Sequence, residues 1–275
     1  YGTLGVADPQ VTPGARDSSA AGMDAAGNFW LFGGGGRSAA GAGPLDDVWR
    51  FDPSQGLWTW TGGSTTDGVA PVHGTRGVAA PGNTPGGRTA ALAWQDGADR
   101  LWIFGGHVRD TDGVEKRMSD LWQYDLGVRT WTWVAGPTTP LQAGSYGTLG
   151  MASVATSPGA RSSGCEWLDT RENLWLFGGN GLDASGTLGS LSDLWRFAPT
   201  TGLWTWMAGR AIVDQAGRYG VLGVSDPDNA PGARLCGGCW TDARGDFWLF
   251  GGDFAYDRAG GTPGSLNDLW HYEGS

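Results

Sequence analysis

A repeat of about 73 residues constrains this chain more than any other feature of its sequence. The tetrapeptide Pro-Gly-x-Arg occurs four times in 275 residues, and successive arginines are 72, 73 and 73 positions apart. A Trp stands fourteen residues after each Arg, a Gly-Gly pair follows that Trp, and an Asp-x-Trp comes next. All 17 Trp residues fall on this frame. We therefore expect each repeat to be one copy of the same structural unit.

Each repeat is predicted to contain four short strands. The first follows the Arg, the second ends at the Gly-Gly pair, the third contains Asp-x-Trp, and the fourth contains Trp-Thr-Trp. Gly, Asn and Asp lie between them at positions that suit hairpin turns, and no stretch shows a useful helical periodicity. Four strands in each of several radially arranged units predict an all-β fold of the β-propeller type, with each blade a four-stranded antiparallel sheet.

The repeat frame also sets the expected blade boundaries. We expect one propeller domain, or part of one, over 1–275, with blades at about 13–62, 85–136, 158–209 and 231–275. The fourth repeat reaches Ser275 before a Trp-Thr-Trp, which predicts fifteen blade strands and one open edge. The four units are thus expected to belong to a longer array or to pair with another chain. Connectors of about 22 residues separate the blades and are expected to fold over one face as an ordered layer.

The Gly-Gly pair, the Asp-Leu-Trp segment and the spaced Trp residues resemble the kelch motif. The resemblance covers nearly the whole chain, although the repeat is longer than a usual kelch repeat. A Tyr-Gly-Thr-x-Gly stretch before each Pro-Gly-x-Arg is similar to the Trp-rich kelch repeats of secreted bacterial multirepeat proteins, with His73 and Val221 as departures. The resemblance implies a binding or scaffolding role, because only a minority of kelch domains belong to enzymes such as galactose oxidase.

Composition excludes several classes of function. The net charge of −10 argues against nucleic acid as a partner, and no apolar run approaches the roughly 18 residues of a membrane span. Aromatic residues make up 12% of the chain, which argues against disorder despite 51 Gly. Few Lys, an acidic surface and the resemblance together predict a secreted or cell-surface protein.

The residues that could carry catalysis or bind a metal are few. The three His residues occupy unrelated repeat positions, match no copper-ligand motif and suggest no catalytic constellation. Cys165, Cys236 and Cys239 lie on expected first strands of adjacent repeats. They favour a disulfide or small-residue packing, with a soft-metal site as the alternative. Positions 236 and 239 point to opposite faces of a strand, and no fourth ligand is evident.

The polar residues common to all repeats are predicted to be structural. The Asp of Asp-x-Trp is expected to bind backbone N–H groups of a turn. The Arg is expected to join blades through carboxylates or carbonyls. These residues are Arg16, Arg88, Arg161, Arg234, Asp47, Asp120, Asp193 and Asp268.

Binding is predicted where the repeats differ, in the loops between the second and third strands. Asp110 and Asp112 in one loop would allow Ca²⁺ as a cofactor, although a solvated acidic loop is favoured and no other cofactor is expected. The candidate binding residues are His107, Arg109, Asp110, Asp112, Asn180, Asp183, Asp253, Phe254, Tyr256 and Asp257.

These observations predict a non-catalytic extracellular module that binds or scaffolds. Its partner is expected to be another protein, a glycan or further copies of the same array. The first alternative is an oxidoreductase domain of the galactose-oxidase type with a metal site in the channel. The second alternative is a glycan-binding lectin.

Overall fold

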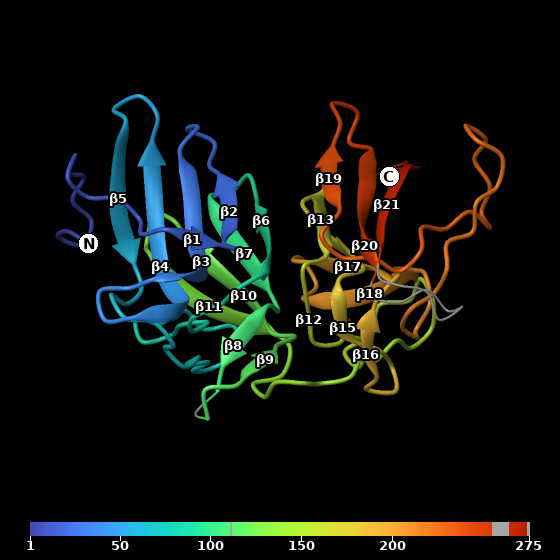
Figure 1. Cartoon of the computed structure of the whole chain (residues 1–275), viewed down its shortest axis with the longest axis horizontal. Coiled ribbons are helices and arrows are strands. Elements are labelled where there is room, and N and C mark those ends of the chain that lie inside the picture. Colours follow the sequence, from blue (N-terminus) through green and yellow to red (C-terminus); the bar gives the residue numbers. More distant parts are fainter. Residues whose placement is uncertain (111, 255–263, 274–275) are drawn as a thin grey trace. The chain divides into compact units, whose positions relative to one another are not determined.

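The computed structural model describes residues 1–110, 112–254 and 264–273. All of the regular elements in these ranges are β-strands, which confirms the predicted all-β class (Figure 1). The described ranges contain no helix long and apolar enough to cross a membrane. The chain divides into two compact units, Tyr1–Pro140 and Leu141–Ser275. Each unit holds two of the four repeats.

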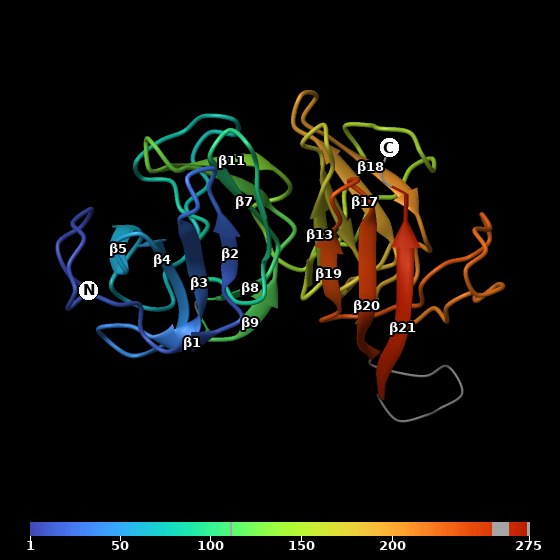
Figure 2. The same cartoon turned by 90° about the horizontal axis from the view of Figure 1, so that it is seen from above.

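Unit 1 contains two antiparallel sheets that follow the predicted order of strands (Figure 2). The first sheet consists of β2 (Ala20–Met23), β3 (Phe29–Arg37), β4 (Ala42–Asp52) and β5 (Leu57–Gly62), with β1 (Arg16–Asp17) paired to the far end of β3. The second sheet consists of β6 (Leu92–Gln95), β7 (Arg100–Phe104), β10 (Leu121–Asp125) and β11 (Thr130–Ala135). A separate hairpin of β8 (His107–Arg109) and β9 (Glu115–Arg117) lies between β7 and β10 in the chain.

Unit 2 repeats this arrangement with one strand fewer. Its first sheet consists of β13 (Cys165–Leu168), β14 (Leu174–Phe177), β17 (Leu194–Ala198) and β18 (Leu203–Ala208). A small sheet beside it contains β12 (Arg161–Ser162), β15 (Asn180–Leu182) and β16 (Leu188–Ser190). The last sheet consists of β19 (Gly238–Thr241), β20 (Phe247–Phe254) and β21 (Gly264–Tyr272). The segments between second and third strands, predicted only as loops, thus contain strands: they form small sheets of their own in the second and third repeats and extend the main strands in the first and fourth.

The Gly-Gly pair lies within the second strand in the first and fourth repeats and directly after it in the other two. Gly33 and Gly34 have φ angles of 64° and 94°, and the pairing of β3 with β4 shifts register there. A Cβ atom on Gly33 would lie 2.7 Å from the Leu45 carbonyl oxygen and 2.9 Å from that of Arg88. Only glycine adopts this conformation at such close approach without strain, which explains why the pair recurs in every repeat.

Large aromatic side chains fill the space between the two main sheets within each unit. In unit 1, Trp30 and Phe32 of the first sheet share a buried cluster with Ile103 of the second. In unit 2, the ring of Phe247 on β20 stacks on Trp167 of β13 at a centroid distance of 5.4 Å. One buried Trp removes roughly 150–250 Å² from water, so a Trp-rich repeat supplies a core although its strands are short.

The connectors lie differently from the layer over one face that the sequence predicts. The connectors before the first three repeats run along the outer strand of the repeat that follows, as shown by the backbone bridges of Ala7 to Thr59 on β5, Ala80 to Trp131 on β11 and Ser153 to Trp204 on β18. An outer strand presents unpaired N–H and C=O groups. The connectors therefore cover sheet edges, and this use of backbone polar groups accounts for their length.

Candidate functional site

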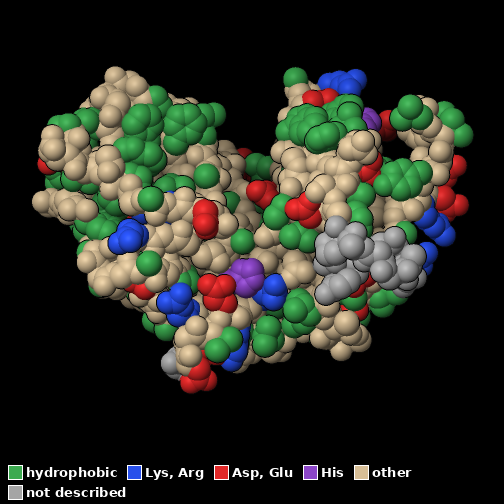
Figure 3. Space-filling model, viewed as in Figure 1, with side chains coloured by type: hydrophobic (Ala, Val, Ile, Leu, Met, Phe, Trp, Pro, Cys, Tyr) green, Lys and Arg blue, Asp and Glu red, His purple; other side chains and the backbone are tan. Residues whose placement is uncertain are grey.

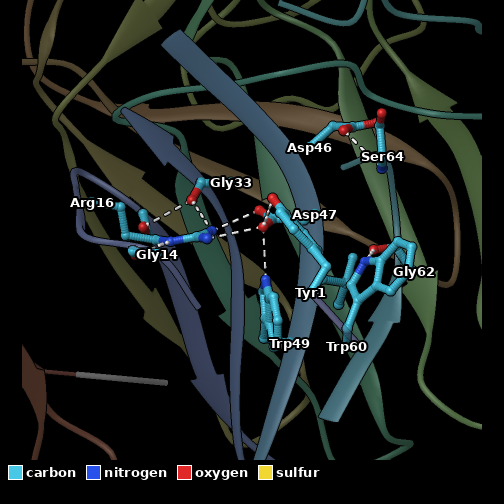
Figure 4. A network of polar contacts seen from close by, with 12 residues as sticks. Tyr1, Gly14, Arg16, Gly33, Asp46, Asp47, Trp49, Trp60, Gly62 and Ser64 are labelled. Carbon is cyan, nitrogen blue, oxygen red and sulfur yellow. Dashed lines mark hydrogen bonds and ion pairs between the residues drawn. The ribbon is translucent and has the colours of Figure 1, made fainter. Parts of the chain in front are cut away.

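The Asp of Asp-x-Trp is the centre of a polar cluster in each repeat, shown for the first repeat in Figure 4. Arg16 binds both carboxylate oxygens of Asp47, at 2.6 and 2.9 Å. The Trp49 indole N–H and the Tyr1 hydroxyl each donate to Asp47 Oδ2 at 2.7 Å. Arg16 also donates to the Gly33 carbonyl at 3.0 Å. We call this arrangement the Asp–Arg cluster.

The same cluster occurs in all four repeats. In the second, the ion pair measures 2.6 Å at both oxygens, and His73 Nε2 lies 3.0 Å from Asp120 Oδ2, in the position of the tyrosine. The partners of the repeat aspartates therefore differ from the turn amides that the sequence suggests, because bidentate guanidinium and indole groups satisfy the buried carboxylate. The remaining clusters consist of Arg161, Asp193, Trp195 and Tyr146, and of Arg234, Asp268, Trp270 and Tyr219.

In the second and fourth repeats, the Arg of the cluster joins two sheets through its backbone rather than its side chain. The Arg88 amide donates to the Leu45 carbonyl at 2.9 Å, and the Arg88 carbonyl accepts from the Gly34 amide at 2.7 Å. Both partners belong to the preceding repeat. The guanidinium stays within its own repeat, so the expected connection between blades is made by main-chain atoms.

The electrostatics of the clusters suit a fixed ion pair. Burial alone would raise the pKa of Asp120, but the Arg88 charge and hydrogen bonds from Arg88, His73 and Trp122 hold it at about 2. Burial and the adjacent Asp193 charge raise the pKa of Tyr146 above its ordinary value. The carboxylate therefore remains ionised and the phenol neutral at pH 7. Asp120 and Tyr146 belong to different repeats, and each stabilises its own cluster through these contacts.

A second repeated aspartate has a role that the sequence analysis missed. Asp24 accepts a hydrogen bond from the Trp30 indole N–H at 2.8 Å and from amides of its own turn. The equivalent indole bonds of the other repeats measure 2.7, 2.9 and 3.2 Å. The signal was present in the sequence, because this Asp stands eight residues after each repeat Arg. These bonds fix the turn between the first two strands.

Among the candidate binding residues, those of the second repeat lie on the β8–β9 hairpin. His107 and Arg109 are half-buried on β8, and burial followed by the Arg117 charge lowers the pKa of His107. Asp110 at the tip pairs with Lys116 at 2.5 Å and accepts from the amides of the loop. Its oxygens therefore hold the hairpin together. Figure 3 shows acidic, basic and histidine side chains mixed over this region.

The candidate residues of unit 2 lie on two other hairpins. Asn180 is on β15, and Asp183 accepts hydrogen bonds from the amides of Ser185 and Thr187 at the hairpin tip. Asp253 and Phe254 end β20, where Asp253 accepts from the Ser265 hydroxyl at 2.7 Å. Tyr256 and Asp257 lie outside the described residues. The candidates thus occupy three separate hairpins.

A shallow depression of about 450 Å³ joins two hairpins of unit 1. The β3–β4 hairpin contributes Arg37 and Gly43, and Glu115 comes from β9. A Cβ on Gly43 would lie 2.9 Å from the Arg109 guanidinium and 2.7 Å from an Asp67 carboxylate oxygen. Gly43 therefore leaves room for a basic group from β8 and an acidic group from the following connector beside the β3–β4 hairpin.

A disulfide joins the first strands of the two main sheets of unit 2. Cys165 on β13 is bonded to Cys239 on β19, with Cα atoms 5.8 Å apart, while Cys236 is a free and exposed thiol. Oxidised sulfurs are not thiolate ligands. In the parts of the chain that the structure describes, no group of three or more His, Cys, Asp or Glu residues is arranged to hold a metal ion.

Comparison with known proteins adds information on the fold. No family model and no curated protein matches the sequence. Among solved structures, the chain is similar to the structure of YjhT, with a TM-score of 0.51 and 14% identity, over 96% of this chain and 67% of that chain. A likeness at this level of identity concerns the fold alone.

Proposed function

We propose that this chain is a kelch-type β-propeller module of an extracellular protein, and that it binds another protein through the hairpins between its second and third strands. One observation carries the proposal. The ionisable residues that all repeats share are held in Asp–Arg clusters or in the turns between first and second strands, whereas the hairpins between second and third strands carry charged residues that differ between repeats. Variable loops on a rigid scaffold are where binding surfaces usually occur.

Two further features support the module's type and location. The order of strands in each main sheet is that of a propeller blade, and kelch-like glycines and tryptophans occupy equivalent places in every main sheet. The disulfide between Cys165 and Cys239 fits an oxidising compartment. The hairpin side chains combine both signs of charge, which suits a protein surface of mixed charge better than a polyanion.

The test is a binding screen of the purified chain against secreted proteins, with a glycan array and a copper assay in parallel. Each protein that binds is measured again with Arg109→Glu, which reverses one charge on the β8–β9 hairpin. Arg171→Glu is the matched control, because Arg171 is exposed in a turn between first and second strands. We expect at least tenfold weaker binding for the first variant and no change for the second.

Other results would contradict the proposal. Equal effects of both variants would place binding away from the hairpins. Glycan binding without protein binding would favour a lectin. Stoichiometric copper with peroxide production from galactose would favour an oxidoreductase.

A further inference from the structure

The last sheet of unit 2 has an uncovered edge at β21. In the preceding sheet, β18 pairs with β17 from Leu194 opposite Ala208 to Ala198 opposite Leu203. Phe197 of β17 is fully buried there, and its ring lies 5.1 Å from that of Trp204 on β18. In the described residues no strand follows β21, and its equivalent residue Tyr272 is 43% exposed. The edge and an aromatic side chain are thus left without the neighbour that the repeat provides elsewhere.

The connector before the fourth repeat keeps the position that the other connectors have beside their outer strands. In the third repeat, the Gly150 amide donates to the Trp206 carbonyl at 2.8 Å, and the ring of Tyr146 meets Trp206 edge-on at 5.1 Å. In the fourth repeat, Tyr219 keeps its 2.7 Å bond to Asp268. Yet Tyr219 is 62% exposed, whereas Tyr146 is 6% exposed. The connector therefore holds its cluster bond while its outer-strand contact is missing.

Within the described residues, the Asn side chain of this connector also lacks an acceptor that the second repeat provides. The Asn83 side-chain amide donates to the Val78 carbonyl and to the Trp131 carbonyl of the outer strand, both at 3.0 Å. The equivalent Asn229 donates to the Val224 carbonyl at 3.1 Å, and within the described residues it has no second acceptor. In both ribbon views the connector lies on the β21 side of its sheet (Figures 1 and 2). Figure 3 shows open space between the two.

We propose that the slot between β21 and the 219–229 connector binds one added antiparallel strand of the Leu-Trp-Thr-Trp type, supplied by a polypeptide segment outside these 275 residues. The three filled slots define this occupant. Each holds a strand with two Trp residues two positions apart, so that both point to the same face. All three such strands are paired within their own sheets, so the occupant comes from elsewhere.

The contacts of each Trp explain why the slot selects this sequence. The first Trp packs on an aromatic ring of the third strand, as Trp204 does on Phe197. The second packs on the connector ring, at 5.3, 5.2 and 5.1 Å in the three filled slots. In the empty slot these two positions are Tyr272 and Tyr219. By the register of β17 with β18, the first Trp of the incoming strand lies opposite Tyr272 and the second opposite Trp270. Main-chain bonds to the β21 edge add affinity that does not depend on sequence.

The experiment adds a synthetic peptide with the sequence of residues 201–209, which includes β18, to the purified 275-residue chain. The control peptide has both Trp residues replaced by Ser. We expect one-to-one binding of the Trp peptide by calorimetry, a rise in the melting temperature of unit 2, and at least tenfold weaker binding of the control peptide. Tyr272→Ser should weaken binding at least tenfold. Phe29→Ser should not, because Phe29 is a similarly exposed aromatic of unit 1 outside the slot.

A second variant keeps the proposal falsifiable if Tyr272→Ser fails to fold. A chain extended after Ser275 by a short linker and the same nine residues should melt at a higher temperature and should no longer bind the peptide. Equal binding of both peptides, or binding unchanged by Tyr272→Ser and by the extension, would overturn the proposal. Self-association of the chain that removes peptide binding and is insensitive to the extension would also overturn it, by assigning the edge to a second copy.

Discussion

Replacing Asp193 by Asn should destabilise unit 2 much more than replacing Asp268 by Asn, although the two residues make the same set of bonds. Asp193 and its partner Arg161 both have side chains with no exposed area, and their ion pair measures 2.6 Å. Asparagine would leave the Arg161 guanidinium buried without a counter-charge. Removing one partner of a buried pair costs about 3–5 kcal/mol, and we expect a loss in this range.

Asp268 provides an internal comparison of the same chemistry at a different burial. Its side chain is 15% exposed, and it pairs with Arg234 at 2.7 Å. The Arg234 side chain is only 1% exposed, but the exposed side of residue 268 lets water approach the guanidinium that the substitution leaves unpaired and screen its charge. We therefore expect Asp268→Asn to lower the free energy of unfolding by about 1–2 kcal/mol. The difference between the losses in the free energy of unfolding of the two variants measures the contribution of burial.

The assay is urea unfolding at pH 7, followed by Trp fluorescence and far-UV circular dichroism, with the free energy extrapolated to zero urea. A double variant, Arg161→Met with Asp193→Leu, removes both charges and leaves apolar groups of similar size. It should lose less stability than Asp193→Asn alone. Equal losses for Asp193→Asn and Asp268→Asn, or a double variant less stable than the single one, would refute the argument that an uncompensated buried charge sets the cost.

Three further predictions concern pH, backbone strain and the disulfide. The pKa of Asp120 is about 2 against an ordinary value of 3.8, so its ionised form stabilises unit 1 above pH 4. We expect the free energy of unfolding, measured in urea, to fall by about 2 kcal/mol between pH 4 and pH 2. This decrease should be absent in Asp120→Asn. Ala90 has a φ of 53°, so Ala90→Gly should stabilise unit 1 by about 0.5–1 kcal/mol in urea unfolding, while Ala91→Gly should not. The disulfide closes a separation of 74 residues, so its reduction should lower the stability of unit 2 by about 2–4 kcal/mol, measured with and without reductant.

Much of the fold follows from the sequence because the same local patterns occur four times. Trp-Thr-Trp and the aromatic run before Gly-Gly have the period of two that strands require, and repetition removes the ambiguity of a single short run. The Gly-Gly pair marks an irregularity because Gly33 combines a positive φ with two carbonyl oxygens too close to admit a Cβ atom. These patterns depend on neighbouring residues, and neighbouring residues are what a sequence shows directly.

The candidate site is less predictable because its contacts join distant residues. The Tyr146 hydroxyl binds a carboxylate 47 positions later, and no local pattern links the two residues. The hairpin strands β8 and β9 lie where the repeats differ, so comparison between repeats gives no support for them. Cys165 and Cys239 stand four and five residues after their arginines. Alternation along one strand does not predict their pairing, because it depends on how two sheets face each other.

The Asp–Arg cluster also bears on how such a chain can change length in evolution. In the third repeat its members run from Tyr146 to Trp195, so one contiguous stretch of the chain encodes the whole cluster. A duplication or deletion of one 73-residue stretch of the gene therefore adds or removes a complete ion pair and leaves no charge without its partner. The number of repeats can vary without compensating substitutions elsewhere, and natural variants are expected to differ by whole repeats rather than by parts of one.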